Sequence, residues 1–325
     1  MCLFPRLLQN PKYKKNKKNG GVIPEMKDER VALVPVGCGE CIECKKRKKR
    51  EWQIRLSEEI KVNKGVFVTL TFDREHFKKY YDKLHKFYTG YDLDNEICTL
   101  AVRHFLERVR KKTKKSLRHW LITELGHNGC ESVHLHGIIF TDNINIIKEK
   151  WQNGFVWCGY QKNEMNVNYV NERTINYITK YILKVDLIHK GYKNKILCSS
   201  GIGSNYINTY NFLLNKKKQV TNENYIFKDG TKSNLPIYYR NKRYTEKERE
   251  ELWLEKLDKN IRWVLGKKID VSKDDKEYFE VLKEAQELNK FLGYGNGELD
   301  WKQLEYIKKK RNLKIKQKVY GIKIS

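Results

Sequence analysis

The spacing of hydrophobic residues along the chain has two periods, which together predict a mixture of strands and helices. Residues 66–72, VFVTLTF, are β-branched and aromatic, as is typical of a strand. Residues 117–125 and 133–140 have the same character and flank a short turn, so we expect an antiparallel hairpin. A further strand is predicted over residues 154–160, whereas residues 73–97 look like a surface excursion.

Apolar residues spaced three or four apart predict the helices. The predicted helical ranges are 52–60, 101–109, 144–151, 172–185, 245–259, 273–291 and 298–312. Thr245 followed by Glu248 is a possible capping box at the start of one of them. Residues 9–30 are rich in lysine, asparagine and glycine without periodicity, and predict a mobile basic arm.

These patterns divide the chain into three segments and favour an α+β fold. Residues 1–62 hold the basic arm, a cysteine cluster and a helix, and residues 63–190 hold the predicted strands and form the expected core. Residues 191–325 are loop-rich and then helical, and we expect them to be an accessory region that binds DNA.

Charge narrows the choice of partner. The 325 residues include 67 Lys and Arg against 40 Asp and Glu, a formal net charge of +27, which favours a polyanion such as nucleic acid. A hydrophobic fraction of 39% is enough to bury a core. The apolar runs are too short to span a bilayer, and the basic tract follows the short apolar start, the reverse of a secretory signal, so we expect no export.

Two histidines on a predicted strand form the first candidate site. His134 and His136 are two residues apart, so their side chains project from the same face of the strand. Glu124 belongs to the other strand of the predicted hairpin and can lie beside His134. Two imidazoles and one carboxylate suit Mn²⁺ or Mg²⁺ and leave positions open for phosphate oxygens. The alternative is a half-buried strand that merely carries two polar side chains.

Two tyrosines on the following helix form the second. Tyr177, Tyr181 and Lys184 share one helical face, with Lys180 at its edge. A phenol has a pKa near 10 and is a poor nucleophile at neutral pH unless a cation and a lysine assist it. Tyrosine attack on a phosphodiester conserves the bond energy as phosphotyrosine, and a second tyrosine permits a second transfer. The alternative is that the tyrosines flank the core and the lysines are solvated.

Cys38, Cys41 and Cys44 have the C-x-x-C-x-x-C spacing and can give three thiolates to one structural zinc ion. A tetrahedral site needs a fourth ligand, and Cys2, Cys130, Cys158 or a histidine could provide it. Part of an iron–sulfur motif and a reduced loop are the alternatives.

A run of six basic residues follows the cysteine motif directly. It comprises Lys45, Lys46, Arg47, Lys48, Lys49 and Arg50. So much positive charge in the first turns of a helix opposes the helix dipole, and contact with a phosphate backbone would offset that cost. We therefore interpret the run as a DNA-binding segment that gives affinity rather than sequence choice.

Taken in order, the strand VFVTLTF, the H-x-H strand and the Y-x-x-x-Y helix with its lysine resemble the HUH endonucleases that initiate rolling-circle DNA replication. The resemblance is more specific to the replication initiators of gokushoviruses, a branch of the small single-stranded DNA phages (Microviridae). It extends to the cysteine motif with Glu51-Trp52, to Thr69–Asp73, to Gly201-Ile202-Gly203 with Tyr206, and to Leu235–Arg240.

This resemblance implies an HUH core with a central antiparallel sheet flanked by helices. It implies that Tyr177 and Tyr181 are the paired nucleophiles, that His134 and His136 hold the metal, and that Lys180 is the lysine between the tyrosines. The reaction would nick viral origin DNA, leave a 5′-phosphotyrosine link and a free 3′-OH, and later rejoin the ends to release circular single-stranded DNA.

The expected partners are viral origin DNA, single-stranded or supercoiled, with a host helicase and polymerase in the host cytoplasm. Neither a membrane nor a small-molecule substrate is expected. Within the enzymes, a plasmid-type relaxase or a single-strand transposase is the alternative, because both share this chemistry. Outside the enzymes, the alternative is a zinc-stabilised DNA-binding or packaging protein without catalysis.

Overall fold

The computed structural model describes residues 2–126, 132–158, 169–189, 191–216 and 222–297. The chain forms two compact units. We call residues 53–205 the sheet unit, and residues 1–52 with 206–298 the terminal unit. This division brings the two ends of the described chain together, whereas the three segments inferred from sequence run consecutively and remain predictions as domain boundaries. The helix predicted at 298–312 lies outside the described residues.

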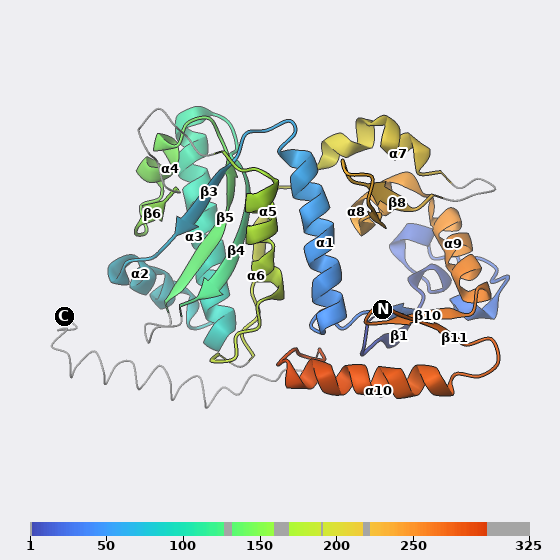
Figure 1. Ribbon diagram of the computed structural model, residues 1–325. Helices are drawn as coiled ribbons and strands as arrows, with labels where there is room; N and C mark the ends of the chain where they lie inside the picture. The colour runs from blue at the N-terminus through green and yellow to red at the C-terminus, as the bar shows by residue number, and fades with distance from the viewer. Residues whose placement is uncertain (1, 127–131, 159–168, 190, 217–221, 298–325) are drawn as a thin grey trace. The chain divides into compact units, whose positions relative to one another are not determined.

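A five-stranded antiparallel sheet forms the centre of the sheet unit (Figure 1). The strand order is β6-β3-β5-β4-β7. The bounds are Val66–Leu70 for β3, Arg118–Leu125 for β4, Val133–Phe140 for β5, Val156–Trp157 for β6 and Ile196–Cys198 for β7. The sheet and its flanking helices confirm the α+β prediction, and β4 and β5 are the predicted hairpin. The strand predicted over 154–160 is shorter within the described residues.

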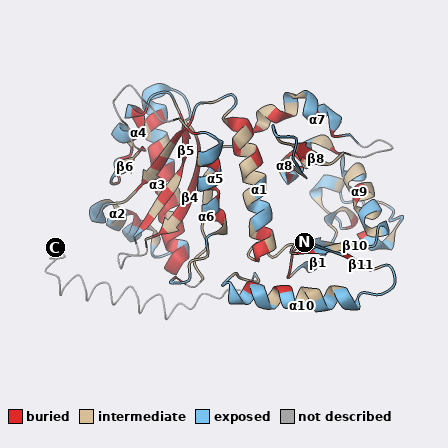
Figure 2. Ribbon diagram, in the orientation of Figure 1, coloured by how far each residue is buried: buried red, intermediate tan, exposed pale blue. Residues whose placement is uncertain are grey.

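Helices α2 (Arg74–Leu84), α3 (Gly90–Thr113) and α4 (Asn145–Lys150) cover one face of the sheet. Alternate strand residues such as Val68, Leu121 and Leu135 are fully buried against the apolar stripe of α3, where Ala101 and Phe105 are also fully buried (Figure 2). The interpretation of residues 73–97 as a surface excursion is wrong. Asp73 caps α2 by accepting a hydrogen bond from the His76 backbone N–H, and the helix then buries Tyr80.

The opposite face of the sheet is covered by α5 (Glu172–Ile178) and α6 (Lys180–Leu183). The sequence predicts one helix over 172–185, but the structure has two short helices that meet at Thr179 and end before Lys184. The Thr179 hydroxyl donates to the Ile175 backbone carbonyl at 2.7 Å, which is the kind of contact that bends a helix. Ile175, Ile178 and Ile182 are buried as the periodicity predicts.

The C-terminal end of helix α1 (Ile42–Glu59) also packs in the sheet unit. The predicted helix is confirmed, although it begins inside the cysteine motif rather than after it. The Glu59 carboxylate is almost fully buried and accepts two hydrogen bonds from Arg118 on β4, at 2.7 and 2.8 Å. It also accepts from the Gly203 backbone N–H at 2.6 Å, so one carboxylate joins α1, β4 and the glycine-rich loop.

In the terminal unit, β1 (Arg6–Gln9) pairs with β2 (Leu33–Val36). Between them lie the 3₁₀ helices η1 (Pro11–Tyr13), η2 (Lys17–Asn19) and η3 (Glu29–Val31). The prediction of a mobile arm over residues 9–30 is therefore wrong. Tyr13 is buried, and Glu250 receives hydrogen bonds from both Tyr13 and Lys12. These side-chain anchors have no periodic signature.

The rest of the terminal unit consists of short elements. They are η4 (Ser204–Asn208, across the unit boundary), α7 (Tyr210–Leu214), β8 (Asn224–Ile226), β9 (Lys232–Asn234), α8 (Ile237–Arg243), α9 (Glu246–Asp258), β10 (Ile261–Val264), β11 (Lys267–Asp270) and α10 (Lys276–Phe291). The predicted helices at 245–259 and 273–291 are confirmed, as is the capping box of Thr245 and Glu248. Among the described helices, none has the length and apolar character to cross a membrane.

Candidate metal and tyrosine site

The candidate site lies on the face of the sheet that α5 and α6 cover, and the strand register creates it. Glu124 on β4 pairs directly with His134 on β5, as the hairpin predicted. His136 pairs with Ile122 on one side and with Thr69 of β3 on the other. Directly paired residues point to the same face of a sheet, so these side chains project together. The next residue, Gly137, must be glycine because a Cβ there would lie 2.2 Å from the Trp120 carbonyl oxygen.

The carboxylate and the two imidazoles converge on one point. Oε2 of Glu124 lies 2.9 Å from Nε2 of His136 and 3.2 Å from Nε2 of His134. Their ligand atoms all fall within 4.8 Å of one another, close enough to hold one cation. The side chains are partly buried, with 12% exposure for Glu124 and His136 and 21% for His134. The site is therefore sheltered but open to solvent on one side.

The second nitrogen of each imidazole fixes the ring orientation. Nδ1 of His134 lies 3.3 Å from the Ser132 backbone carbonyl, which can only accept, so Nδ1 carries the proton. The neutral ring then presents a lone pair at Nε2 toward the Glu124 carboxylate, and two such acceptors need a cation between them. Nδ1 of His136 lies 2.9 Å from the Thr69 hydroxyl, the same kind of support that orients metal-binding histidines.

The two tyrosines lie beside this cluster. The Tyr181 ring stacks on the His136 imidazole, with centroids 4.5 Å apart and planes at 22°. The Tyr177 and Tyr181 hydroxyls are 3.0 Å apart and share a hydrogen bond. Tyr177 is 52% exposed, whereas Tyr181 is partly buried. Burial raises the pKa of Tyr181, and the hydrogen bond to Tyr177 and the charge of Glu124 raise it further. Without help from a cation, this phenol is a poor nucleophile.

The two candidate lysines take different positions. Lys184 forms an ion pair with Oε1 of Glu124, the carboxylate oxygen that the histidines do not face. Lys180 is exposed on α6 and does not share this contact. Burial opposes ionisation of Glu124, but hydrogen bonds from His134, His136 and Lys184 outweigh it and hold the pKa of the carboxyl far below its usual range. The carboxylate is therefore charged and available to a cation at neutral pH.

An aromatic side chain that the sequence did not single out also borders the site. Phe67 of β3 stacks parallel to His136, with centroids 6.2 Å apart. Its ring meets Trp157 and Tyr177 edge-on, at 5.6 and 6.0 Å. The outer face of the site is thus largely aromatic. Both Thr69 and Phe67 sit at alternate positions of the VFVTLTF strand, so pairing that strand with the histidine strand would have found them.

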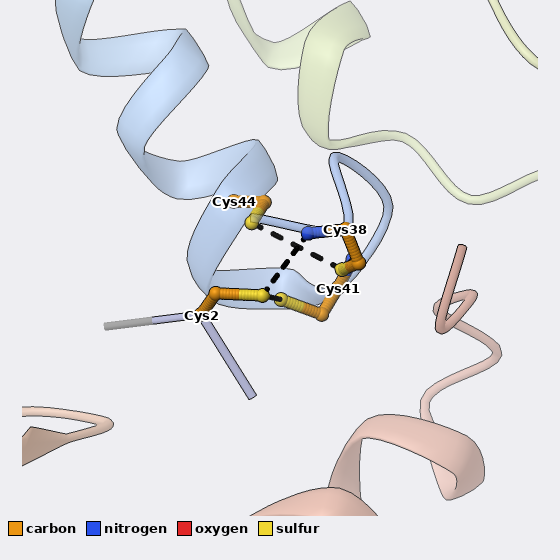
Figure 3. A group of neighbouring side chains, drawn as sticks. All are labelled: Cys2, Cys38, Cys41 and Cys44. Carbon is orange, nitrogen blue, oxygen red and sulfur yellow. Dashed lines mark hydrogen bonds between the residues drawn. The ribbon is translucent and has the colours of Figure 1, made fainter. Parts of the chain in front are cut away.

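The cysteine motif and the basic run lie in the terminal unit. The structure adds Cys2 to Cys38, Cys41 and Cys44, and their sulfur atoms lie within 4.8 Å of one another (Figure 3). Cys158 is buried at the edge of the sheet, and Cys130 lies outside the described residues.

Residues 45–50 are helical, as expected, and occupy the first half of α1. Six consecutive helical positions surround the helix instead of forming one face. Lys46, Arg47, Lys48 and Arg50 are exposed, whereas Lys45 and Lys49 are partly covered. The DNA contact stays a prediction.

Comparison with known proteins gives one match. No curated protein and no solved structure matches the chain significantly. Residues 65–186 match the family model of the ORF2-type replication-associated protein. The matched range runs from the start of β3 past α6, and so contains the two histidines, Glu124 and both tyrosines. The sheet unit is therefore similar, over the part that carries the candidate site, to a family of replication-associated proteins.

Proposed function

We propose that this protein initiates rolling-circle replication by nicking origin DNA with a tyrosine, in the manner of HUH endonucleases. The observation that carries the proposal is the meeting of two sets of side chains. Two imidazoles and a carboxylate converge on one point, and a pair of tyrosines reaches the same point from the helices that cover it. A protein that only binds or packages DNA has no need of both sets.

The donor atoms fit a hard divalent cation. Glu124, His134 and His136 would hold Mn²⁺ or Mg²⁺ through one oxygen and two Nε2 atoms, with both Nδ1 atoms already engaged. When bound, the cation would polarise the scissile phosphate as a Lewis acid. Lys184 adds a positive charge at the Glu124 oxygen that faces away from the histidines.

The tyrosines supply the covalent chemistry in this proposal. The hydroxyl oxygen of one tyrosine attacks the scissile phosphorus, the bond from phosphorus to the 3′ oxygen breaks, and the phenolic proton leaves to solvent or a nearby base. The products are a 5′-phosphotyrosine and a 3′-OH. The Tyr177 and Tyr181 hydroxyls are 3.0 Å apart, so the second tyrosine can attack a new origin while the first is occupied.

The aromatic border would hold unpaired DNA. The Phe67 ring contacts both Tyr177 and Trp157 edge-on, and base stacking on aromatic rings tolerates any sequence. A nickase needs its target strand unpaired at the cleavage point, and such a border can keep bases separated. The formal charge of +27 over the chain would supply the general attraction to the phosphate backbone.

The test is a nicking assay on a supercoiled plasmid that carries the origin region of the replicon encoding this protein. We expect open circles that form with Mn²⁺ and not with EDTA. Each nicked strand should carry protein covalently at its 5′ end, and mass spectrometry should place the adduct on Tyr177 or Tyr181. An adduct on another residue, or nicks with a free 5′ phosphate, would contradict the proposal. Binding without cleavage would favour the packaging alternative.

A further inference from the structure

The cysteines that the sequence left one ligand short are completed by the N-terminal end of the chain. Sγ of Cys2 lies 3.9 Å from Sγ of Cys41, and Sγ of Cys38 lies 4.0 Å from Sγ of Cys44 (Figure 3). All four sulfur atoms lie within 4.8 Å of one another, and all four are free thiols. The figure shows the four side chains directed toward a common centre between the start of the chain and the first turn of α1.

These separations match a single tetrahedral ion. A zinc–sulfur bond of about 2.3 Å places the sulfur atoms of a regular tetrahedron about 3.8 Å apart. The two measured pairs are within a few tenths of an ångström of that value. A cluster of several irons would separate the sulfurs further, because each thiolate then binds a different metal atom.

Backbone N–H groups are directed at the sulfurs, as metal thiolates require. Sγ of Cys2 accepts hydrogen bonds from the Cys38 backbone N–H at 3.2 Å and from the Phe4 backbone N–H at 3.3 Å. Sγ of Cys38 accepts from the Cys41 backbone N–H at 3.3 Å. Gly39, with φ of +85°, makes the turn between Cys38 and Cys41 that brings these groups together. Such donors stabilise thiolates and orient them.

The helix and its charges also favour a negative centre here. Cys41 immediately precedes α1 and Cys44 belongs to its first turn, where the helix dipole stabilises thiolates. Four thiolates around a divalent ion leave a doubly negative centre. The basic run from Lys45 to Arg50 follows directly and offsets that charge. The run that opposes the helix dipole thus gains an electrostatic partner within the same unit.

The cluster lies within a small hydrophobic core. Cys41, Cys44 and Cys2 are 0%, 4% and 8% exposed. They pack with Leu3 and Ile42, and with Val264, Ile269 and Ala285 from the β10–β11 hairpin and α10. So few apolar side chains form a weak core by themselves, and small cores of this kind are commonly reinforced by a metal.

We propose that Cys2, Cys38, Cys41 and Cys44 bind one structural Zn²⁺ and thereby fasten the N-terminal end of the chain to α1. Zinc is chosen because four thiolates at tetrahedral spacing around one ion are its usual structural ligand set. The proposal is independent of the nicking reaction, since none of the four cysteines belongs to the tyrosine site. Without the ion, the N-terminal residues and the core around α10 should loosen together.

The experiment measures zinc in the full-length protein. Elemental analysis after dialysis against EDTA should give one zinc per chain, a value unchanged in the His134→Ala/His136→Ala variant, which excludes the other metal cluster as its source. Cys2→Ser should weaken zinc binding more than about tenfold, because one of four thiolates is replaced. Cys198→Ser alters an exposed cysteine of the sheet unit and is the matched control, which should keep the full zinc content.

Replacement of zinc by Co²⁺ gives a second measurement on the unmodified chain. We expect the intense thiolate-to-cobalt absorption of a tetrahedral four-sulfur site, and joint protection of the four cysteines from alkylation that ends when the metal is stripped. This readout remains available if Cys2→Ser fails to fold. Absence of zinc, alkylation of Cys2 in the zinc-loaded protein, or the absorption spectrum of an iron–sulfur cluster would each overturn the proposal.

Discussion

The Tyr181 ring lies flat against the His136 imidazole, with ring centroids 4.5 Å apart. One residue is a candidate nucleophile on α6, and the other is a candidate metal ligand at the centre of the sheet. Their stacking fixes the distance between the phenol and the cation that would activate its target. Tyr177 joins the same arrangement through its hydrogen bond to Tyr181. The site is therefore organised before DNA arrives, which lowers the cost of aligning the reacting groups.

Removal of the imidazoles should abolish cleavage and leave the fold intact. His134→Ala/His136→Ala takes away two of three ligands, so we expect nicking to fall by at least about a hundredfold. Circular dichroism and the thermal midpoint should change little, because both side chains border solvent. His85→Ala alters an exposed histidine of α2's C-terminal cap and should nick normally. Normal nicking by the double variant would contradict the metal site.

Loss of the Thr69 hydroxyl should weaken metal binding without touching a ligand. Thr69→Val keeps the shape of the side chain but removes the partner of His136 Nδ1, and such changes cost about 10- to 100-fold in metal affinity. The measurement is the Mn²⁺ concentration that gives half-maximal nicking. Thr69→Ser retains the hydroxyl and should resemble the wild type. If the valine variant needs no more Mn²⁺ than the serine variant, Thr69 does not position His136.

The two tyrosines should be partly interchangeable for a single cut. Tyr177→Phe and Tyr181→Phe should each keep some cleavage of a single-stranded origin oligonucleotide, because the other phenol remains at the site. The double substitution should abolish it. Neither single variant should release circular product, since that step needs both hydroxyls. Covalent adducts in the double variant would place the nucleophile elsewhere.

Lys184 should affect the rate of cleavage more than DNA binding. Lys184→Ala removes the ion pair with Glu124 and a positive charge beside the phosphate, so we expect cleavage to slow by about tenfold or more. Equilibrium binding to the oligonucleotide should change little, because one charge among many is lost. Lys184→Arg keeps the charge and should recover part of the rate. A matching loss of binding and cleavage in the alanine variant would indicate a DNA contact instead.

Arg118 should matter for stability. Arg118→Met removes both hydrogen bonds from the buried Glu59 carboxylate, and an uncompensated buried charge costs about 3 kcal/mol or more. Thermal or urea unfolding of the sheet unit should show the loss. Glu59→Gln/Arg118→Met removes the stranded charge and should recover part of it. Equal stability of the single and double variants would mean that Glu59 is not stranded by the loss of Arg118.

Much of the site follows from local rules. A hairpin between 117–125 and 133–140 can have only a few registers that bury one face, and alternation then places Glu124, His134 and His136 on the other face. The structure pairs Glu124 with His134 as predicted. The buried isoleucines of the tyrosine helix and the capping box at Thr245 were likewise predicted, since each depends on residues within one or two helical turns.

Other features were invisible to those rules. Helix α2 was missed because it buries only Tyr80 among mostly exposed charged residues, which leaves little hydrophobic periodicity. The N-terminal arm was taken as mobile because its anchors, Tyr13 and Lys12, find their partner Glu250 far along the chain. The break at Thr179 depends on a side-chain hydrogen bond that competes with the helix.

The sequence by itself determined which residue types share a strand face or a helix face, because periodicity is a property of neighbours along the chain. Only the tertiary structure decided which faces meet. The packing of α6 on the sheet brought Tyr181 to His136 and Lys184 to Glu124, and the pairing of β3 with β5 brought Thr69 to His136. Cys2 was selected from several candidates in the same way. Such contacts depend on burial and close packing between distant segments, and no local pattern encodes them.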